Sequence, residues 1–121
     1  MMTREDGSLY APFGVMGGFM QPQGHVLVAV GLLDDDTAPQ AVLDRPRLCL
    51  EPVDGVGQLV LEDGVPAATV DALRGRGHDV IPGVSGFDRS LFGRGQIIRR
   101  ERDGALVGGS DPRGDGCATG T

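Results

Sequence analysis

Two adjacent glycines, Gly17 and Gly18, are the residues of this 121-residue chain that point most directly to chemistry. Because a glycine has no Cβ, its backbone N–H can approach a ligand closely. Pro22 follows and can begin a helix, which would direct unpaired N–H groups and the positive end of its dipole toward the same place. Such an arrangement suits an oxyanion or a carboxylate. A tight turn is the simpler interpretation of the same pair, and no Lys-Ser or Lys-Thr follows to indicate a phosphate loop.

No nucleophile stands in a recognisable setting elsewhere in the chain. The only histidines are His25 and His78, and neither has a serine or cysteine partner from which a triad could be argued. We expect His25 at the boundary of the core and His78 just after a helix end, where a cation complements the dipole. Some hydrolases use an N-terminal threonine as nucleophile, but two residues precede Thr3, so this role is not expected for it.

The sequence indicates neither a metal nor another cofactor. The run 34–36 is three aspartates without the central glycine and terminal glutamate of a calcium loop, so we expect a solvated turn there. Cys49 and Cys117 lack metal-ligand spacing and cannot form a disulfide framework, so both are predicted to be buried free thiols. The segment Ser110-Asp111-Pro112-Arg113 is interpreted as a turn in which the serine and aspartate bond nearby backbone groups.

The composition argues against nucleic acid and membrane partners. The net charge is −6, whereas phosphate binding needs clustered Lys and Arg. The basic run 99–102 is interrupted by Glu101 and is expected to be a solvated hairpin edge. The polar start of the chain is unlike a signal peptide, and the apolar stretch 26–33 is too short to span a membrane. As written, the chain is therefore expected in the cytoplasm.

The elements around the glycine pair are predicted with different clarity. Residues 9–15 form a predicted strand, broken by Pro12, that leads into the glycines. Residues 23–33 are β-rich by propensity, yet their continuous apolar character also suits a buried helix, and periodicity alone cannot decide. The pattern Thr37-Ala38-Pro39-Gln40 is typical of a capping box and predicts a helix that runs to about Asp44.

The rest of the chain alternates short apolar runs with glycine and proline breaks, which is typical of short strands and turns. A helix is predicted from near Pro66, with Val70 and Leu73 facing inward, and it ends at Gly75 or Gly77. Because strands and helices mix without a strict βαβ repeat, the predicted class is α+β. Strands are predicted over 47–50, 58–63 and 79–81, the last closed by Pro82-Gly83. A loop over 85–95 comes next, and a hairpin of 96–100 and 105–108 turns at Asp103-Gly104. The tail over 111–121 is expected to be turn-like.

Taken together, these segments resemble the C-terminal part of the small subunit in the gamma-glutamyltransferase (gamma-glutamyltranspeptidase) family. Family members carry a Gly-x-Pro-Gly-Gly stretch before a long apolar helix, then an Ala-Pro-Arg element, and finally a hairpin followed by Ser-Asp-Pro-Arg. The resemblance covers the chain from about Asp6 onward and assigns residues 23–33 to a helix. The matching positions here are 14–18, the helix through Leu33, Arg45-Pro46-Arg47, residues 95–98, the turn at 103–104, and 110–113.

The resemblance implies a part of the αββα sandwich of the N-terminal nucleophile hydrolases. In that family a precursor cleaves itself, and the newly exposed threonine attacks a gamma-glutamyl carbonyl. The acyl group then passes to water or to an amino acid. Two adjacent glycines supply the oxyanion hole, and they match Gly17 and Gly18. The nucleophile and the residues that hold the glutamyl group lie upstream in the family. Residues 1–121 are therefore expected to be a single partial domain, inactive alone, whose partner is the missing N-terminal part or large subunit.

This chain departs from the family pattern beside the glycines. The usual Pro-Gly-Gly-Ser is replaced by Met16-Gly17-Gly18-Phe19. The sequence of residues 16–25 resembles that of a side branch of the family whose members include predicted acylases and an oxamate-type amidohydrolase. The expected substrate is therefore a small amide, gamma-glutamyl or other. Two alternatives from other classes stay open: a non-catalytic module that docks through an unpaired sheet edge, and a binder of small anions that uses the glycine pair alone.

Overall fold

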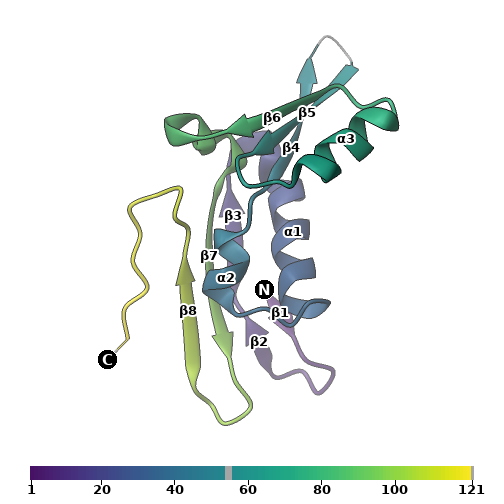
Figure 1. Cartoon of the computed structure of the whole chain (residues 1–121). Helices are drawn as coiled ribbons and strands as arrows, with labels where there is room; N and C mark the ends of the chain where they lie inside the picture. Colours follow the sequence, from purple (N-terminus) through teal and green to yellow (C-terminus); the bar gives the residue numbers. More distant parts are fainter. Residues whose placement is uncertain (54–55, 121) are drawn as a thin grey trace.

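The computed structural model describes residues 1–53 and 56–120 and shows the α+β mixture that the sequence predicts (Figure 1). The helices are α1 (Gln21–Leu33), α2 (Pro39–Asp44) and α3 (Ala67–Gly75), with 3₁₀ turns η1 (Gly18–Met20) and η2 (Gly86–Phe92). The strands are β1 (Met2–Thr3), β2 (Leu9–Ala11), β3 (Phe13–Met16), β4 (Leu48–Val53), β5 (Val56–Glu62), β6 (Val80–Val84), β7 (Arg94–Arg100) and β8 (Leu106–Ser110).

The sheet that leads to the glycine pair is antiparallel, in the order β3-β7-β8. Pro12 separates β2 from β3, as predicted, because proline cannot donate a ladder hydrogen bond. The predicted hairpin is confirmed, with β7 and β8 joined by the turn that contains Gly104. In this register Val15 pairs with Gly95 and Met16 with Arg94, so the end of β3 lies against the start of β7.

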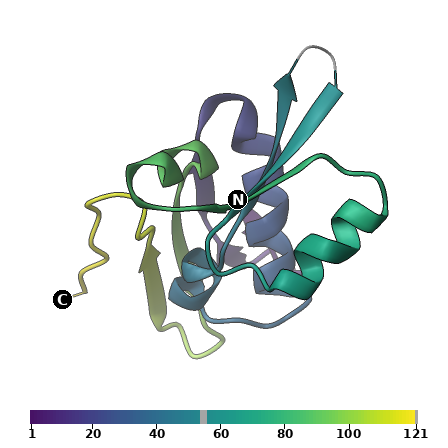
Figure 2. The same ribbon diagram turned by 45° about the horizontal axis from the view of Figure 1, so that its top comes forward.

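The second sheet has the order β4-β5-β6, and α3 connects the neighbouring parallel strands β5 and β6 (Figures 1 and 2). The helix predicted after Pro66 is confirmed, with Val70 buried and Leu73 packed beside it. The predicted end of β6 at Pro82 is wrong, since the strand continues to Val84. An edge strand accepts this proline because its missing N–H costs no ladder bond.

The prediction of a loop over residues 85–95 is wrong for most of this range, because η2 forms over Gly86–Phe92 and β7 begins at Arg94. Phe92 explains this, because its fully buried ring anchors the 3₁₀ turn to the core. Packing against distant residues, which short-range patterns do not report, orders the segment.

Helix α1 packs against β3 so closely that a Cβ on Gly24 would lie 2.8 Å from Val15 Cγ1. The main core lies where α1 and α2 cover one face of the β3-β7-β8 sheet, and it includes Val28, Leu32 and Ile97. The helix implied by the family resemblance is confirmed. Periodicity could not reveal it because the outward positions of α1 are apolar as well, namely Val26, Val30 and Leu33.

The capping box predicted at Thr37 is wrong, although α2 ends at Asp44 as expected. Ala38 is the N-cap residue and no side chain caps the helix. Thr37 Oγ1 instead accepts a hydrogen bond from Arg45 Nη2 at 2.7 Å. Gln40 reaches Ser110, donating to its carbonyl oxygen at 2.9 Å and accepting from its N–H at 3.0 Å. Both side chains therefore serve contacts between elements.

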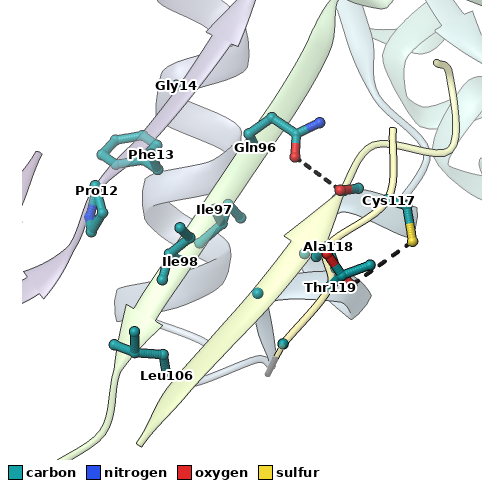
Figure 3. Close-up of a pocket in the computed structure, with 14 residues that line it drawn as sticks. Pro12, Phe13, Gly14, Gln96, Ile97, Ile98, Leu106, Cys117, Ala118 and Thr119 are labelled. Carbon is teal, nitrogen blue, oxygen red and sulfur yellow. Dashed lines mark hydrogen bonds between the residues drawn. The ribbon is translucent and has the colours of Figure 1, made fainter. Parts of the chain in front are cut away.

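The opposite face of the β3-β7-β8 sheet is open, and we call it the open sheet face. It presents Gln96, Ile98 and Leu106, and the C-terminal tail runs along its β8 side, so that tail and strands together line a half-open hollow of about 990 Å³ (Figure 3). Cys117 is exposed in this tail, so the prediction of buried thiols is right for Cys49 and wrong for Cys117. Over the described residues, the helices are all too short or too polar to cross a bilayer.

Candidate functional site

The glycine pair stands where β3 ends and a helix begins. η1 runs directly into α1, and Met20 N–H donates to the Gly17 carbonyl oxygen at 3.2 Å. Gly18 has φ 59°, a conformation that glycine adopts at little cost. Among residues 1–53 and 56–120, the N–H groups of Gly17 and Gly18 have no hydrogen-bond acceptor. Two backbone donors therefore remain available at the N-terminal end of a helical segment.

The two glycines have different surroundings. A Cβ on Gly17 would lie 2.9 Å from Gly93 Cα, whereas a Cβ on Gly18 would meet nothing within 4 Å. Gly93 itself has φ 71°, and a Cβ there would lie 2.5 Å from the Met16 carbonyl oxygen. Gly17 thus rests on the turn at residues 92–93, while Gly18 faces open space.

A hollow of about 510 Å³ lies beside the pair, lined by Met16 before the glycines and by Gln21 and His25 after them. Arg94 and Asp115 also line it, and the Nε of Arg94 donates to the Arg113 carbonyl oxygen at 3.1 Å. Gly17 and Gly18 do not line this hollow themselves, and their neighbours Met16 and Gln21 do.

His25 occupies the boundary position expected of it. Its Nδ1 lies 2.7 Å from the Gln21 carbonyl oxygen, and its Nε2 faces the Val15 N–H at 3.4 Å. Through these two contacts His25 links α1 to β3. The structure places the other two candidates in different elements, Thr3 in β1 and His78 in the exposed segment after α3.

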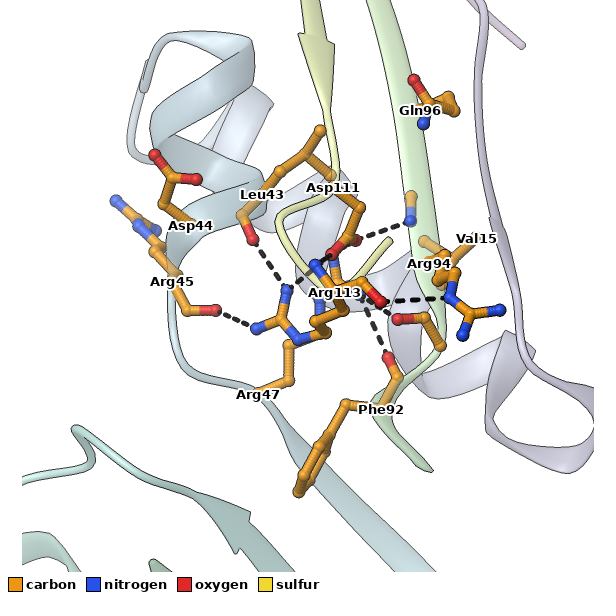
Figure 4. A network of polar contacts seen from close by, with 12 residues as sticks. Val15, Leu43, Asp44, Arg45, Arg47, Phe92, Arg94, Gln96, Asp111 and Arg113 are labelled. Atoms are coloured by element: carbon orange, nitrogen blue, oxygen red, sulfur yellow. Dashed lines mark hydrogen bonds and ion pairs between the residues drawn. The ribbon is translucent and has the colours of Figure 1, made fainter. Parts of the chain in front are cut away.

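Four charged side chains, none more than 8% exposed, form what we call the buried ion cluster: Arg47, Glu62, Asp111 and Arg113. Figure 4 shows three of them, Arg47, Asp111 and Arg113. Arg47 Nη2 donates to Asp111 Oδ2 at 2.6 Å, and Arg113 Nη1 donates to Asp111 Oδ1 at 3.0 Å. Arg113 Nε donates to Glu62 Oε1 at 2.8 Å, and its Nη2 pairs with Glu62 Oε2. Arg89 adds a further pair with Glu62 at the edge of the cluster.

The cluster keeps its carboxylates charged. Burial alone would raise the pKa of Glu62, but hydrogen bonds from Arg113, Arg89 and the Arg47 N–H outweigh burial and hold that pKa below its usual value. The pKa of Asp111 is lowered in the same way: burial opposes ionisation, but the N–H groups of Arg113 and Gly95 and the two arginine charges prevail. Every buried side-chain nitrogen and oxygen in the described part of the chain has a partner.

The sequence interpretation missed this cluster. The local turn predicted at residues 110–113 exists, because Asp111 Oδ1 accepts the Arg113 N–H at 3.0 Å, but its charged side chains mainly serve long-range pairs. A usable signal was that Arg47 and Glu62 directly flank apolar runs that form strands. The solvated edge expected at residues 99–102 is likewise wrong for Arg99, whose side chain is 15% exposed and paired with Glu101 at 2.8 Å.

Comparison with known proteins gives a consistent result. The family model described as gamma-glutamyltranspeptidase matches residues 1–121. The chain is 33% identical over 113 residues to the glutathione hydrolase-like YwrD proenzyme of Bacillus subtilis, covering 89% of this chain and 21% of that protein. It is also 33% identical over 110 residues to the oxamate amidohydrolase proenzyme of Klebsiella pneumoniae, covering 89% and 20%.

A solved structure shows the same architecture. The cephalosporin acylase from Bacillus halodurans matches with a TM-score of 0.80 and 42% identity, over 91% of this chain and 20% of that one. The fold is therefore that of part of an N-terminal nucleophile hydrolase, as the family resemblance implied. The chain spans about a fifth of the length of the curated relatives it matches.

Proposed function

Because this chain belongs to the gamma-glutamyltranspeptidase family, which includes related acylases and amidohydrolases, we propose that it supplies the oxyanion-binding part of an amide hydrolase or acyltransferase. The observation that carries the proposal is the pair of N–H donors at Gly17 and Gly18, which have no acceptor in the described part of the chain and stand at the start of a helical segment. The same residues match the oxyanion glycines of the family pattern.

The chemistry requires such donors at one step. When a hydroxyl nucleophile adds to an amide carbonyl carbon, the electron pair of the C=O bond moves to the oxygen and creates an oxyanion. The two glycine N–H groups would stabilise this charge until the amine leaves with a proton, and water or an amino acid then takes the acyl group. Removing one such donor typically costs about 10²–10³ in kcat.

The nucleophile, in this proposal, lies outside the 121 residues. Thr3 is paired in β1, and Cys49 is buried with a pKa raised by burial and by the nearby Glu51 charge, so neither is suited to attack. The chain spans about a fifth of its relatives, which leaves room for the nucleophile elsewhere in them. The partner is then the N-terminal part or large subunit of the same enzyme, seated on the open sheet face as the facing sheet of the sandwich.

The substrate is proposed at the level of a small amide. The relatives are named as a glutathione hydrolase-like proenzyme, an oxamate amidohydrolase and a cephalosporin acylase, so their names point to different substrates. The residues that flank the glycine pair here, Met16 and Phe19, both have exposed side chains. A gamma-glutamyl group is therefore one candidate acyl group among several.

Complementation tests the proposal. The chain would be co-expressed with the part of the Bacillus halodurans acylase that lies outside the matched region, and hydrolysis of a gamma-glutamyl anilide, oxamate and a cephalosporin amide would be measured. We expect no turnover by the chain alone and turnover of at least one amide by the complex. Gly18→Leu should lower kcat at least about 100-fold. Gly18→Ala carries the same backbone strain with little bulk and should lose less.

Three results would contradict the proposal. Turnover by the purified chain alone, abolished by Thr3→Ala, would place the nucleophile within it. Unchanged kcat in Gly18→Leu would remove the glycine pair from the reaction. A stable complex that hydrolyses none of the amides would favour the non-catalytic docking module.

A further inference from the structure

The buried ion cluster holds the turn on which Gly17 rests. Arg47 is 3% exposed, and its Nη1 donates to the carbonyl oxygens of Phe92 and Gly93 at 3.0 and 3.2 Å. Gly93 is the residue whose Cα would lie 2.9 Å from a Cβ on Gly17. One backbone turn therefore separates the Arg47 guanidinium from the glycine pair.

Asp111 fixes the same turn from its other side. Its Oδ2 accepts from Arg47 Nη2 and from the Gly95 N–H, both at 2.6 Å (Figure 4). Gly95 pairs with Val15 across the β3-β7 ladder. The backbone from Phe92 to Gly95 is thus held at three points, along the stretch that lies against the end of β3.

We propose that Arg47, oriented by Asp111, is a positioning residue for the oxyanion site, an inference that rests on the function proposed above. Backbone donors work only if their direction is fixed before the reaction, and a displacement of about 1 Å can cost about 100-fold in rate. The planar guanidinium reaches two carbonyls and one carboxylate at once. A lysine keeps the charge but offers a compact ammonium that cannot reproduce this fork.

The chain contains a matched control in Arg113. It is also buried and also pairs with Asp111, but its carbonyl acceptors are Leu43 and Arg45, at 2.9 and 2.8 Å. Those acceptors lie at the end of α2 and just beyond it, away from the turn at residues 92–93. Lysine at either arginine disturbs the same ion cluster, but only the change at Arg47 releases the turn.

The test compares Arg47→Lys with Arg113→Lys by three measurements: thermal unfolding, kcat and KM in the complemented enzyme, and the amide NMR resonances of Gly17 and Gly18 in the chain. Both variants should unfold at lower temperature. At equal folded fraction, Arg47→Lys should lower kcat about 10- to 100-fold with KM nearly unchanged, and it should shift both glycine amide resonances. Arg113→Lys should lower kcat far less and leave those resonances in place.

Equal losses of kcat in the two folded variants, or unmoved glycine resonances in Arg47→Lys, would overturn the inference. If Arg47→Lys does not fold, Asp111→Asn replaces it, because it keeps the side-chain shape and removes the charge that orients Arg47. The same shifts and the same contrast with Arg113→Lys are then expected.

Gly18→Leu separates the two proposals. Should it stay active, the proposed function fails; should it be inactive while Arg47→Lys keeps full kcat, only the positioning role fails.

Discussion

Gly17 and Gly18 differ in what a side chain would cost. A methyl group on Gly17 would meet the backbone of Gly93, which cannot rotate away, whereas one on Gly18 would enter open space. We expect Gly17→Ala to lower the free energy of unfolding by about 1–3 kcal/mol through overpacking. Gly18→Ala should cost about 1–2 kcal/mol, from its left-handed backbone alone. Urea unfolding of both variants measures the difference, and a Gly17 variant as stable as wild type would contradict the close packing.

Glu62 is the residue through which we expect pH to act on stability. Its pKa is lowered in the folded state, so its contribution is fully present above the unfolded pKa of about 4.3 and is lost as pH falls through the lower folded value. Asp111 behaves in the same direction. Wild-type stability should therefore decline progressively below about pH 4.

Glu62→Gln isolates this effect. Removing one partner of a buried ion pair costs about 3–5 kcal/mol, so the variant should lose stability of this size at pH 7 and show a flatter decline in acid. Urea unfolding at several pH values measures both quantities. The variant Asp35→Asn, at an exposed pair with Arg45, serves as control and should change stability by less than about 1 kcal/mol. Parallel pH curves for wild type and Glu62→Gln would contradict the role given to Glu62.

At the scale of elements, the close approach of α1 to β3 makes Gly24 a test of packing against helix propensity. Alanine gains about 1 kcal/mol over glycine inside a helix, but here its Cβ would lie 2.8 Å from Val15 Cγ1 and 3.1 Å from Met20 Sδ. We expect Gly24→Ala to be destabilising because overpacking costs about 1–3 kcal/mol. Thermal unfolding of the Gly24→Ala variant measures this loss. Gly75→Ala is the control: a Cβ on this last residue of α3 would meet nothing within 4 Å, so the variant should be neutral or stabilising.

Elements with a strong local signal could be predicted, and those set by packing could not. The Asp103-Gly104 dipeptide predicted the hairpin, and Pro66 predicted the start of α3. The apolar outward face of α1 hid its period, and only the family resemblance assigned the helix. Thr37 failed as a cap because Arg45, from beyond α2, competes for its hydroxyl.

The candidate site divides in the same way. Adjacent glycines before a proline could be recognised from the sequence. The Arg47–Asp111 pair that holds the turn next to Gly17 could not be recognised in this way. The two residues lie 64 positions apart, and charged residues are by default expected on the surface. Burial of such a pair depends on the whole tertiary structure.

At the scale of the whole molecule, the open sheet face should matter for assembly and little for stability. Ile98 is 47% exposed and Leu106 is 67% exposed on this face. We expect Ile98→Lys and Leu106→Lys to change stability by less than about 0.5 kcal/mol, as surface substitutions do, yet to prevent association with the complementing acylase part. Thr69→Lys, on the exposed side of α3, adds the same charge and should assemble normally. Size-exclusion chromatography reports the outcome, and normal assembly of both face variants would place the interface elsewhere.

The position of the buried ion cluster along the chain has a consequence during synthesis. Arg47 and Glu62 leave the ribosome long before Asp111, and at about 5–20 residues per second the 64 positions between Arg47 and Asp111 take about 3–13 s. During this interval the early charges cannot be buried without cost, so the nascent chain gains little by closing its core. A polypeptide terminated before Asp111 would leave Arg47 without its carboxylate partner and Glu62 with Arg89 alone, so we expect it to be degraded more readily than the full chain. We therefore expect the fold to reach its full stability only after Arg113 has been synthesised, because this residue completes the pairs with both Glu62 and Asp111.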